Sequence, residues 1–123
     1  RLHDAATGLD NARALERLLT SEPGGVLVAM RVRNHDEIAA MTDDEQRLAL
    51  IDQIGARIAV VAPNTRLFSL GHGEFAWLNP IDDLTLVTDS LDGLGALFNQ
   101  RLSVGRERLV LTPVFGVAPN SGD

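Results

Sequence analysis

A short glycine-rich segment lies between two apolar segments near the middle of the chain. It reads GHGEF at residues 71–75, after LFSL and before AWL. Glycine adopts positive φ without strain, and its lack of a side chain lets a ligand approach the backbone closely. The segment therefore predicts a β-hairpin, with strands at residues 66–70 and 74–79, and it marks a candidate binding site.

Elsewhere, apolar residues recur at helical spacing in several segments. Residues that cap helix N-termini precede these segments, and the breaker Pro63 follows one of them. We expect the helices to begin at Asp10 or Asn11, at Asn34 or His35, after Thr42, and at Asp82 or Asp83.

The helix after Thr42 has the clearest start signal. Residues 42–45 (TDDE) form a capping-box pattern with acids in the first turn, where the helix dipole favours them. We expect the helix to end before Pro63. The stripe expected to face the core consists of Leu48, Ile51, Ile54, Ile58 and Val61.

The remaining segments predict strands. Residues 26–32 form an almost continuous apolar run, and residues 102–104 and 109–117 indicate two strands joined by a turn at 105–106. The resulting order is helix, strand, helix, helix, hairpin, helix, hairpin. This order predicts a two-layer α/β sandwich of the α+β class, in which helices pack on a ferredoxin-like central antiparallel sheet.

Composition and charge limit the function. The length of 123 residues fits one domain. With 11 basic and 17 acidic residues the net charge is −6, and no basic cluster typical of nucleic-acid binders is present. The apolar runs are too short to span a bilayer, no signal peptide opens the chain, and the absence of cysteine excludes disulfides. We expect a cytoplasmic domain of a longer protein, with no nucleic-acid partner and no direct membrane insertion.

Three motifs resemble the GGDEF domain, the diguanylate cyclase family that makes cyclic di-GMP from GTP. Residues 3–13 (HDAATGLDNAR) resemble its opening D-x-L-T-G-L-x-N-R-R, residues 71–75 its GG(D/E)EF hairpin, and residues 112–118 (TPVFGVA) its late strand T-x-S-I-G-V-A. The resemblance implies a nucleotide-cyclase-like sheet. It assigns residues 1–118 to a degenerate GGDEF domain lacking the family's last helix. The composition of residues 119–123 (PNSGD) predicts a flexible tail.

The positions that the resemblance equates with metal ligands are substituted. Active members hold two Mg²⁺ ions with the first Asp of a D-x-D-x-F-K strand end and the third signature residue, which are Arg31 and Gly73 here. A cation repels Mg²⁺, and glycine offers no side-chain oxygen. Two-metal phosphoryl transfer needs both ions to stabilise the attacking and leaving oxygens. We therefore expect no metal site, lost or weak Mg²⁺ binding, and a chain that is not an enzyme.

The guanine-binding positions are also substituted. The resemblance implies an Asn and an Asp where this sequence has Ala39 and Leu48, whose side chains form no hydrogen bonds. The family's product-inhibition motif R-x-x-D aligns with residues 62–65 (APNT) and is missing. We expect GTP binding to be lost or weak as well.

No residue is assigned a catalytic role on these grounds. The signature loop is interpreted as vestigial, and it consists of Gly71, His72, Gly73, Glu74 and Phe75.

Two alternatives stay open for the polar residues near this loop. Arg31 and Arg33 occupy alternate strand positions and are candidates for contact with an anion, or they pair with nearby acids such as Glu74. His72 either contacts a ligand phosphate or a partner, or it is a solvated turn residue. Trp77 is expected in the core.

The leading hypothesis is a catalytically inactive regulatory or interaction module of a bacterial cyclic di-GMP signalling protein of the GGDEF–EAL type. Its expected partners are an adjacent EAL phosphodiesterase or sensory domain of the parent chain, and a second copy in a homodimer. The alternative is an allosteric GTP- or anion-binding sensor without cyclase activity. The least favoured alternative is an active cyclase with replaced metal ligands.

Overall fold

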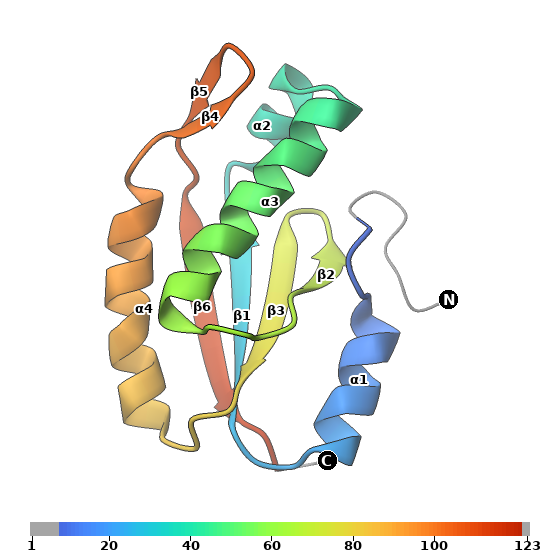
Figure 1. The fold of residues 1–123 in the computed structure, drawn as a ribbon, viewed down its shortest axis with the longest axis vertical. Coiled ribbons are helices and arrows are strands. Elements are labelled where there is room, and N and C mark those ends of the chain that lie inside the picture. Colours follow the sequence, from blue (N-terminus) through green and yellow to red (C-terminus); the bar gives the residue numbers. More distant parts are fainter. Residues whose placement is uncertain (1–7, 122–123) are drawn as a thin grey trace.

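The computed structural model describes residues 8–121, which form helices and strands in nearly the predicted order (Figure 1). Residues 3–7 of the first motif lie outside the described part of the chain. The elements are α1 (Ala12–Ser21), β1 (Val26–Val32), α2 (His35–Met41), α3 (Asp44–Val61), β2 (Phe68–Gly71), β3 (Glu74–Asn79), α4 (Leu84–Phe98), β4 (Leu102–Val104), β5 (Glu107–Leu109) and β6 (Pro113–Pro119).

The main sheet has four strands in the order β2-β3-β1-β6, and every neighbouring pair is antiparallel. The central strand β1 pairs with β3 on one side and β6 on the other. With α2 and α3 after β1 and α4 after β3, the connectivity is β-α-β-β-α-β, the ferredoxin-like arrangement. The predicted α/β sandwich with a central antiparallel sheet is confirmed.

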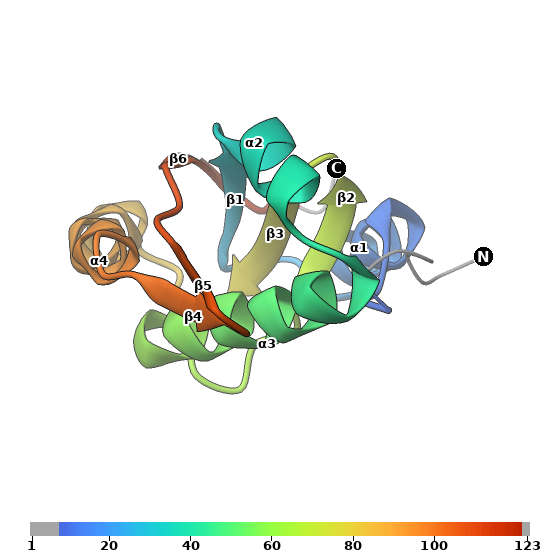
Figure 2. The ribbon, with the colours of Figure 1, turned by 90° about the horizontal axis from the view of Figure 1, so that it is seen from above.

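The long helices α3 and α4 lie on the same side of this sheet, where the main core forms (Figure 2). Alternate residues of β1 face them: Val26, Val28 and Met30 are at most 1% exposed. Trp77 of β3 lies in the same core and is 1% exposed, as predicted. Burial of this apolar surface is the main force that holds the two layers together.

The first helix packs separately, beside the edge strand β2 (Figure 1). Asn11 caps it by accepting hydrogen bonds from two backbone N–H groups, which confirms one of the two predicted start sites. Ala14 and Leu15 of α1 form a second cluster with Phe68 and Ala76. Because these strand residues point away from α3, α1 covers part of the opposite face of the sheet.

The start of α3 differs from the prediction by one residue. Asp43, not Thr42, is the N-cap, and its capping box is completed by Gln46. The Thr42 hydroxyl instead donates to the Ile38 carbonyl of α2. The predicted core stripe is also wrong at its first position: Leu48 is 49% exposed, because the helix directs Leu50 into the core in its place.

The predicted single strand at residues 109–117 is wrong as well. It divides into β5, which pairs with β4 in a small separate hairpin, and β6, which joins the main sheet beside β1. Asn34 fixes the break between them. Its side chain donates to the Val110 carbonyl at 2.8 Å and accepts from the Thr112 N–H at 2.9 Å.

The C-terminal residues are bonded to the first strand and helix. β6 extends to Pro119, and the Asn120 side chain donates to the carbonyls of Leu19 and Glu22. The predicted tail at residues 119–123 therefore begins inside a strand, while residues 122–123 lie outside the described part. No helix within residues 8–121 has the length and apolar character needed to cross a membrane.

Candidate functional site

The glycine-rich segment forms the hairpin that the sequence predicts. β2 and β3 are joined by a two-residue turn, His72-Gly73, at which φ is +51° and +76°. Positive φ at both positions is the geometry of the hairpin turns whose twist matches that of the strands. The His72 side chain is exposed, and the turn stands at the end of the sheet near α2.

Gly73 is held tightly by its neighbours. Its carbonyl accepts a hydrogen bond of 2.9 Å from the Val32 N–H at the end of β1. A Cβ atom added at Gly73 would lie 2.7 Å from both Cβ and Cγ of His35. The His35 side chain therefore occupies the space that an acidic side chain at the third signature position would need.

The register places Arg31 directly opposite Glu74. This is the proximity that a pairing of these two residues requires. Both side chains are exposed, as is Arg33, and neither arginine lines the cavity described next. Arg31 and Gly73 offer no oxygen ligand from their side chains, so these two positions do not fit a magnesium site.

A cavity of about 490 Å³ lies between the signature hairpin, α2 and α3. Its volume falls within the range typical of small-molecule sites. Its apolar wall consists of buried core residues, among them Ile38, Leu50, Ile54, Phe75 and Leu111.

The polar groups at this cavity come from the turn and from both helices. His35 and His72 lie at the hairpin side, and Thr42 and Arg47 lie on the helix side. Ala39, which the resemblance equates with a guanine-binding residue, also lines the cavity. Its counterpart Leu48 does not.

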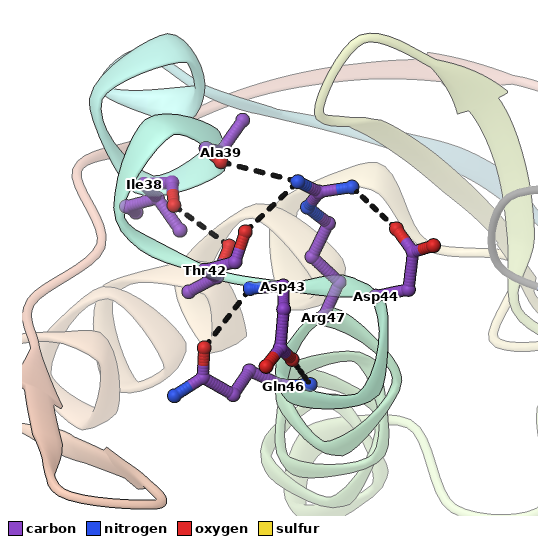
Figure 3. Close-up of polar contacts among 7 residues, drawn as sticks. All are labelled: Ile38, Ala39, Thr42, Asp43, Asp44, Gln46 and Arg47. Carbon is purple, nitrogen blue, oxygen red and sulfur yellow. Dashed lines mark hydrogen bonds and ion pairs between the residues drawn. The ribbon is translucent and has the colours of Figure 1, made fainter.

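Arg47 is a cavity residue that the sequence analysis missed. Its guanidinium donates to the carbonyls of Ala39 and Thr42 at 3.2 and 2.8 Å, and to the carboxylate of Asp44 at 2.8 Å (Figure 3). These bonds hold one cation at the junction of α2 and α3. The available signal was its position one turn after the capping box, which places it beside the preceding loop.

A second cavity, of about 530 Å³, lies at the opposite end of the sheet. Gly24 and Gly25, which precede β1, contribute to its wall, as do Asn64 and Thr65 from the segment aligned with the product-inhibition motif. Arg66, the next residue, pairs with Asp10. Within the described residues, no three His, Cys, Asp or Glu side chains lie close enough together to hold a metal ion.

Comparison with known proteins identifies the fold. No family model and no curated protein matches the sequence. Among solved structures, a diguanylate cyclase/phosphodiesterase from Caldicellulosiruptor saccharolyticus matches with a TM-score of 0.80 at 20% identity, covering 98% of this chain and 77% of that one. The GGDEF domain of FimX from Pseudomonas aeruginosa matches with a TM-score of 0.80 at 17% identity, covering 99% of this chain and 82% of that one.

A third match is the GGDEF domain of DgcB from Caulobacter crescentus, solved in complex with c-di-GMP. Its TM-score is 0.74 at 20% identity, and the alignment covers 98% of this chain and 78% of that one. The chain therefore has the fold of GGDEF diguanylate cyclase domains over nearly its whole length.

The same comparison overturns one prediction. The residues Arg31 and Gly73 led to the prediction that the chain is not an enzyme. The structures that share its fold include diguanylate cyclases, which are enzymes, so that prediction is wrong. The residues at two positions equated with metal ligands are not enough to conclude that a chain with this fold is not an enzyme.

Proposed function

We propose that this chain is a GGDEF-type regulatory domain of a bacterial cyclic di-GMP signalling protein and that it works in the cytoplasm. The observation that carries the proposal is the match of its fold, over nearly the whole chain, to GGDEF domains. The signature hairpin supports it, because the residues that resemble the GG(D/E)EF motif form a two-residue hairpin turn with positive φ at His72 and Gly73.

We further propose that Mg²⁺ and GTP bind weakly in the manner of the family. The positions equated with the metal ligands carry Arg31 and Gly73, and His35 fills the space beside Gly73. Of the two positions equated with guanine recognition, Ala39 lacks a polar group and Leu48 is 49% exposed on the outer side of α3.

Calorimetric titration of the chain with GTP, with and without Mg²⁺, tests this second proposal. We expect no heat of binding that depends on Mg²⁺ at millimolar nucleotide. Chromatography of the same mixtures measures cyclic di-GMP, the product of the enzymes that share this fold. Mg²⁺-dependent binding or product formation would contradict weak binding of metal and GTP.

The regulatory role has its own test. The proposed partners are an adjacent EAL or sensory domain of the parent chain, and a second copy of the domain. Deleting the coding segment for residues 8–121 from the parent gene, with the flanking segments kept in frame, should change cellular cyclic di-GMP. An unchanged level, with the shortened protein present at the normal amount, would refute the regulatory role.

A second candidate function is an allosteric sensor of GTP or another anion. The observation in its favour is the cavity beside the signature turn, where Arg47 supplies a fixed positive charge. In this case GTP should bind without Mg²⁺, and Arg47→Gln should weaken that binding. The exposed Arg31 and Arg33 offer a separate contact, which Arg31→Gln tests in the same titration.

A further inference from the structure

The cavity beside the signature hairpin differs in chemistry from a site for a polyanionic nucleotide. Most of its wall is apolar, and the described residues that line it include no Asp or Glu. Arg47 is the one Lys or Arg among those lining residues, beside the imidazoles of His35 and His72. Such a wall favours a ligand with a large apolar part and a small negative charge.

The polar groups on the wall are mostly engaged within the protein. The Thr42 hydroxyl, 7% exposed as a residue, donates to the Ile38 carbonyl at 2.8 Å. The Ser69 hydroxyl, in a residue that is 4% exposed, accepts from the Gly71 N–H at 3.4 Å. Within the described residues, no buried side-chain nitrogen or oxygen lacks a partner. The interior of the cavity therefore offers few hydrogen bonds by which to recognise a polar base.

Arg47 differs from these groups because part of its guanidinium reaches solvent. Its side chain is 46% exposed, and its carboxylate partner, Asp44, is 97% exposed. The bonds to the carbonyls of Ala39 and Thr42 fix the guanidinium (Figure 3). Arg47 lies at the wall of the cavity. A ligand carboxylate can take the place of the solvent-exposed Asp44 at little cost, because an exposed ion pair is weak.

We propose that this cavity binds an aliphatic monocarboxylate, with the hydrocarbon chain along Ile54 and Phe75 and the carboxylate at Arg47. The volume of about 490 Å³ accepts a medium-length chain. The inference rests on the proposed regulatory function, in which such a ligand is the signal that the domain reports. The ligand of this cavity is then not a guanine nucleotide but a molecule recognised by apolar contacts and one negative charge.

Calorimetry with decanoate, octanoate and decanol tests the proposal on the intact chain. Decanoate should bind one molecule per chain in a saturable manner. Each buried methylene contributes about fourfold to the affinity, so octanoate should bind about 16-fold more weakly. Decanol, which lacks the charge, should bind up to about 5-fold more weakly than decanoate, the most that a partly exposed ion pair usually contributes.

Variants separate the two parts of the site. Ala39→Leu fills the cavity from a partly exposed helix position and should abolish binding of both ligands. Arg47→Gln should weaken decanoate up to about 5-fold and leave decanol unchanged. Arg17→Gln, on the exposed surface of α1, is the matched control and should change neither. Thermal melts of each variant show whether it is folded.

Several outcomes would overturn the proposal. They are non-saturable binding, equal affinity for decanoate and decanol in the unmodified chain, and a folded Ala39→Leu that still binds. If decanoate fails to bind while deletion of the domain changes cellular cyclic di-GMP, only the ligand is wrong. If decanoate binds and the deletion changes nothing, the ligand site stands and the regulatory role is wrong.

Discussion

Replacing Gly73 by alanine measures how tightly His35 closes the signature turn. The added methyl group would lie 2.7 Å from Cβ and Cγ of His35 and 2.9 Å from its Nδ1. Because φ at Gly73 is +76°, alanine also pays for a left-handed conformation, about 1–2 kcal/mol. Forcing the imidazole aside adds about 1–3 kcal/mol, the usual cost of overpacking.

Gly71→Ala is the matched control in the same hairpin. Its φ of +86° imposes a similar backbone cost, but a Cβ added there meets nothing within 4 Å. We expect the free energy of unfolding to fall by about 1–2 kcal/mol for Gly71→Ala. For Gly73→Ala it should fall by about 2–5 kcal/mol, the sum of the backbone and overpacking costs.

Urea denaturation followed by far-UV circular dichroism gives both values, and thermal melts check them at about 4 °C per kcal/mol for a chain of this length. His35→Ala removes the Cγ and Nδ1 contacts, so in that background the cost of Gly73→Ala should fall by about 1 kcal/mol. Equal losses for the two glycine variants, or no coupling to His35, would refute the reasoning that the imidazole occupies this space.

Substitutions at three further positions test other contacts. Asn34→Ala removes both hydrogen bonds that hold residues 110–112 and should lower the free energy of unfolding by about 1–3 kcal/mol, measured in urea, with faster amide exchange at Thr112. Asp43→Ala removes the cap of α3 and should lower the free energy of unfolding by about 1 kcal/mol in the same measurement. Asp43→Asn should lower it much less, because asparagine also caps helices. Arg57→Met keeps the aliphatic stem but loses the guanidinium bonds to the carbonyls at the end of α4. It should lower the free energy of unfolding by about 1–3 kcal/mol, measured by thermal melts. This loss should depend little on salt concentration, because the carbonyl acceptors are uncharged.

The helices and most strands could be predicted because their signals are local. Apolar spacing and capping residues placed α1, α2 and α4 close to their observed starts, and the glycine turn placed the hairpin. The error at residues 109–117 has a non-local cause. Strand propensity continues through this segment, but Asn34, far away in the sequence, bonds to its backbone at residues 110 and 112 and ends the pairing.

The candidate site was less predictable because its walls come from separate segments. The substitutions at Arg31, Gly73 and Ala39 could be found by comparing motifs, since each motif is continuous in the sequence. The positions of His35 and Arg47 at the site could not be predicted in this way. They depend on how α2 packs near the hairpin and on where α3 begins.

The short helix α2 contacts the signature turn at one end and the cavity cation at the other. His35, at the start of this short helix, closes the turn where a metal ligand would stand. At the other end, the carbonyls of Ala39 and Thr42 hold Arg47. The helix thus fills the space beside Gly73 and fixes a cation at the edge of an apolar wall. Binding of metal and nucleotide at the turn and binding of an apolar ligand in the cavity are therefore separate questions, and each needs its own measurement.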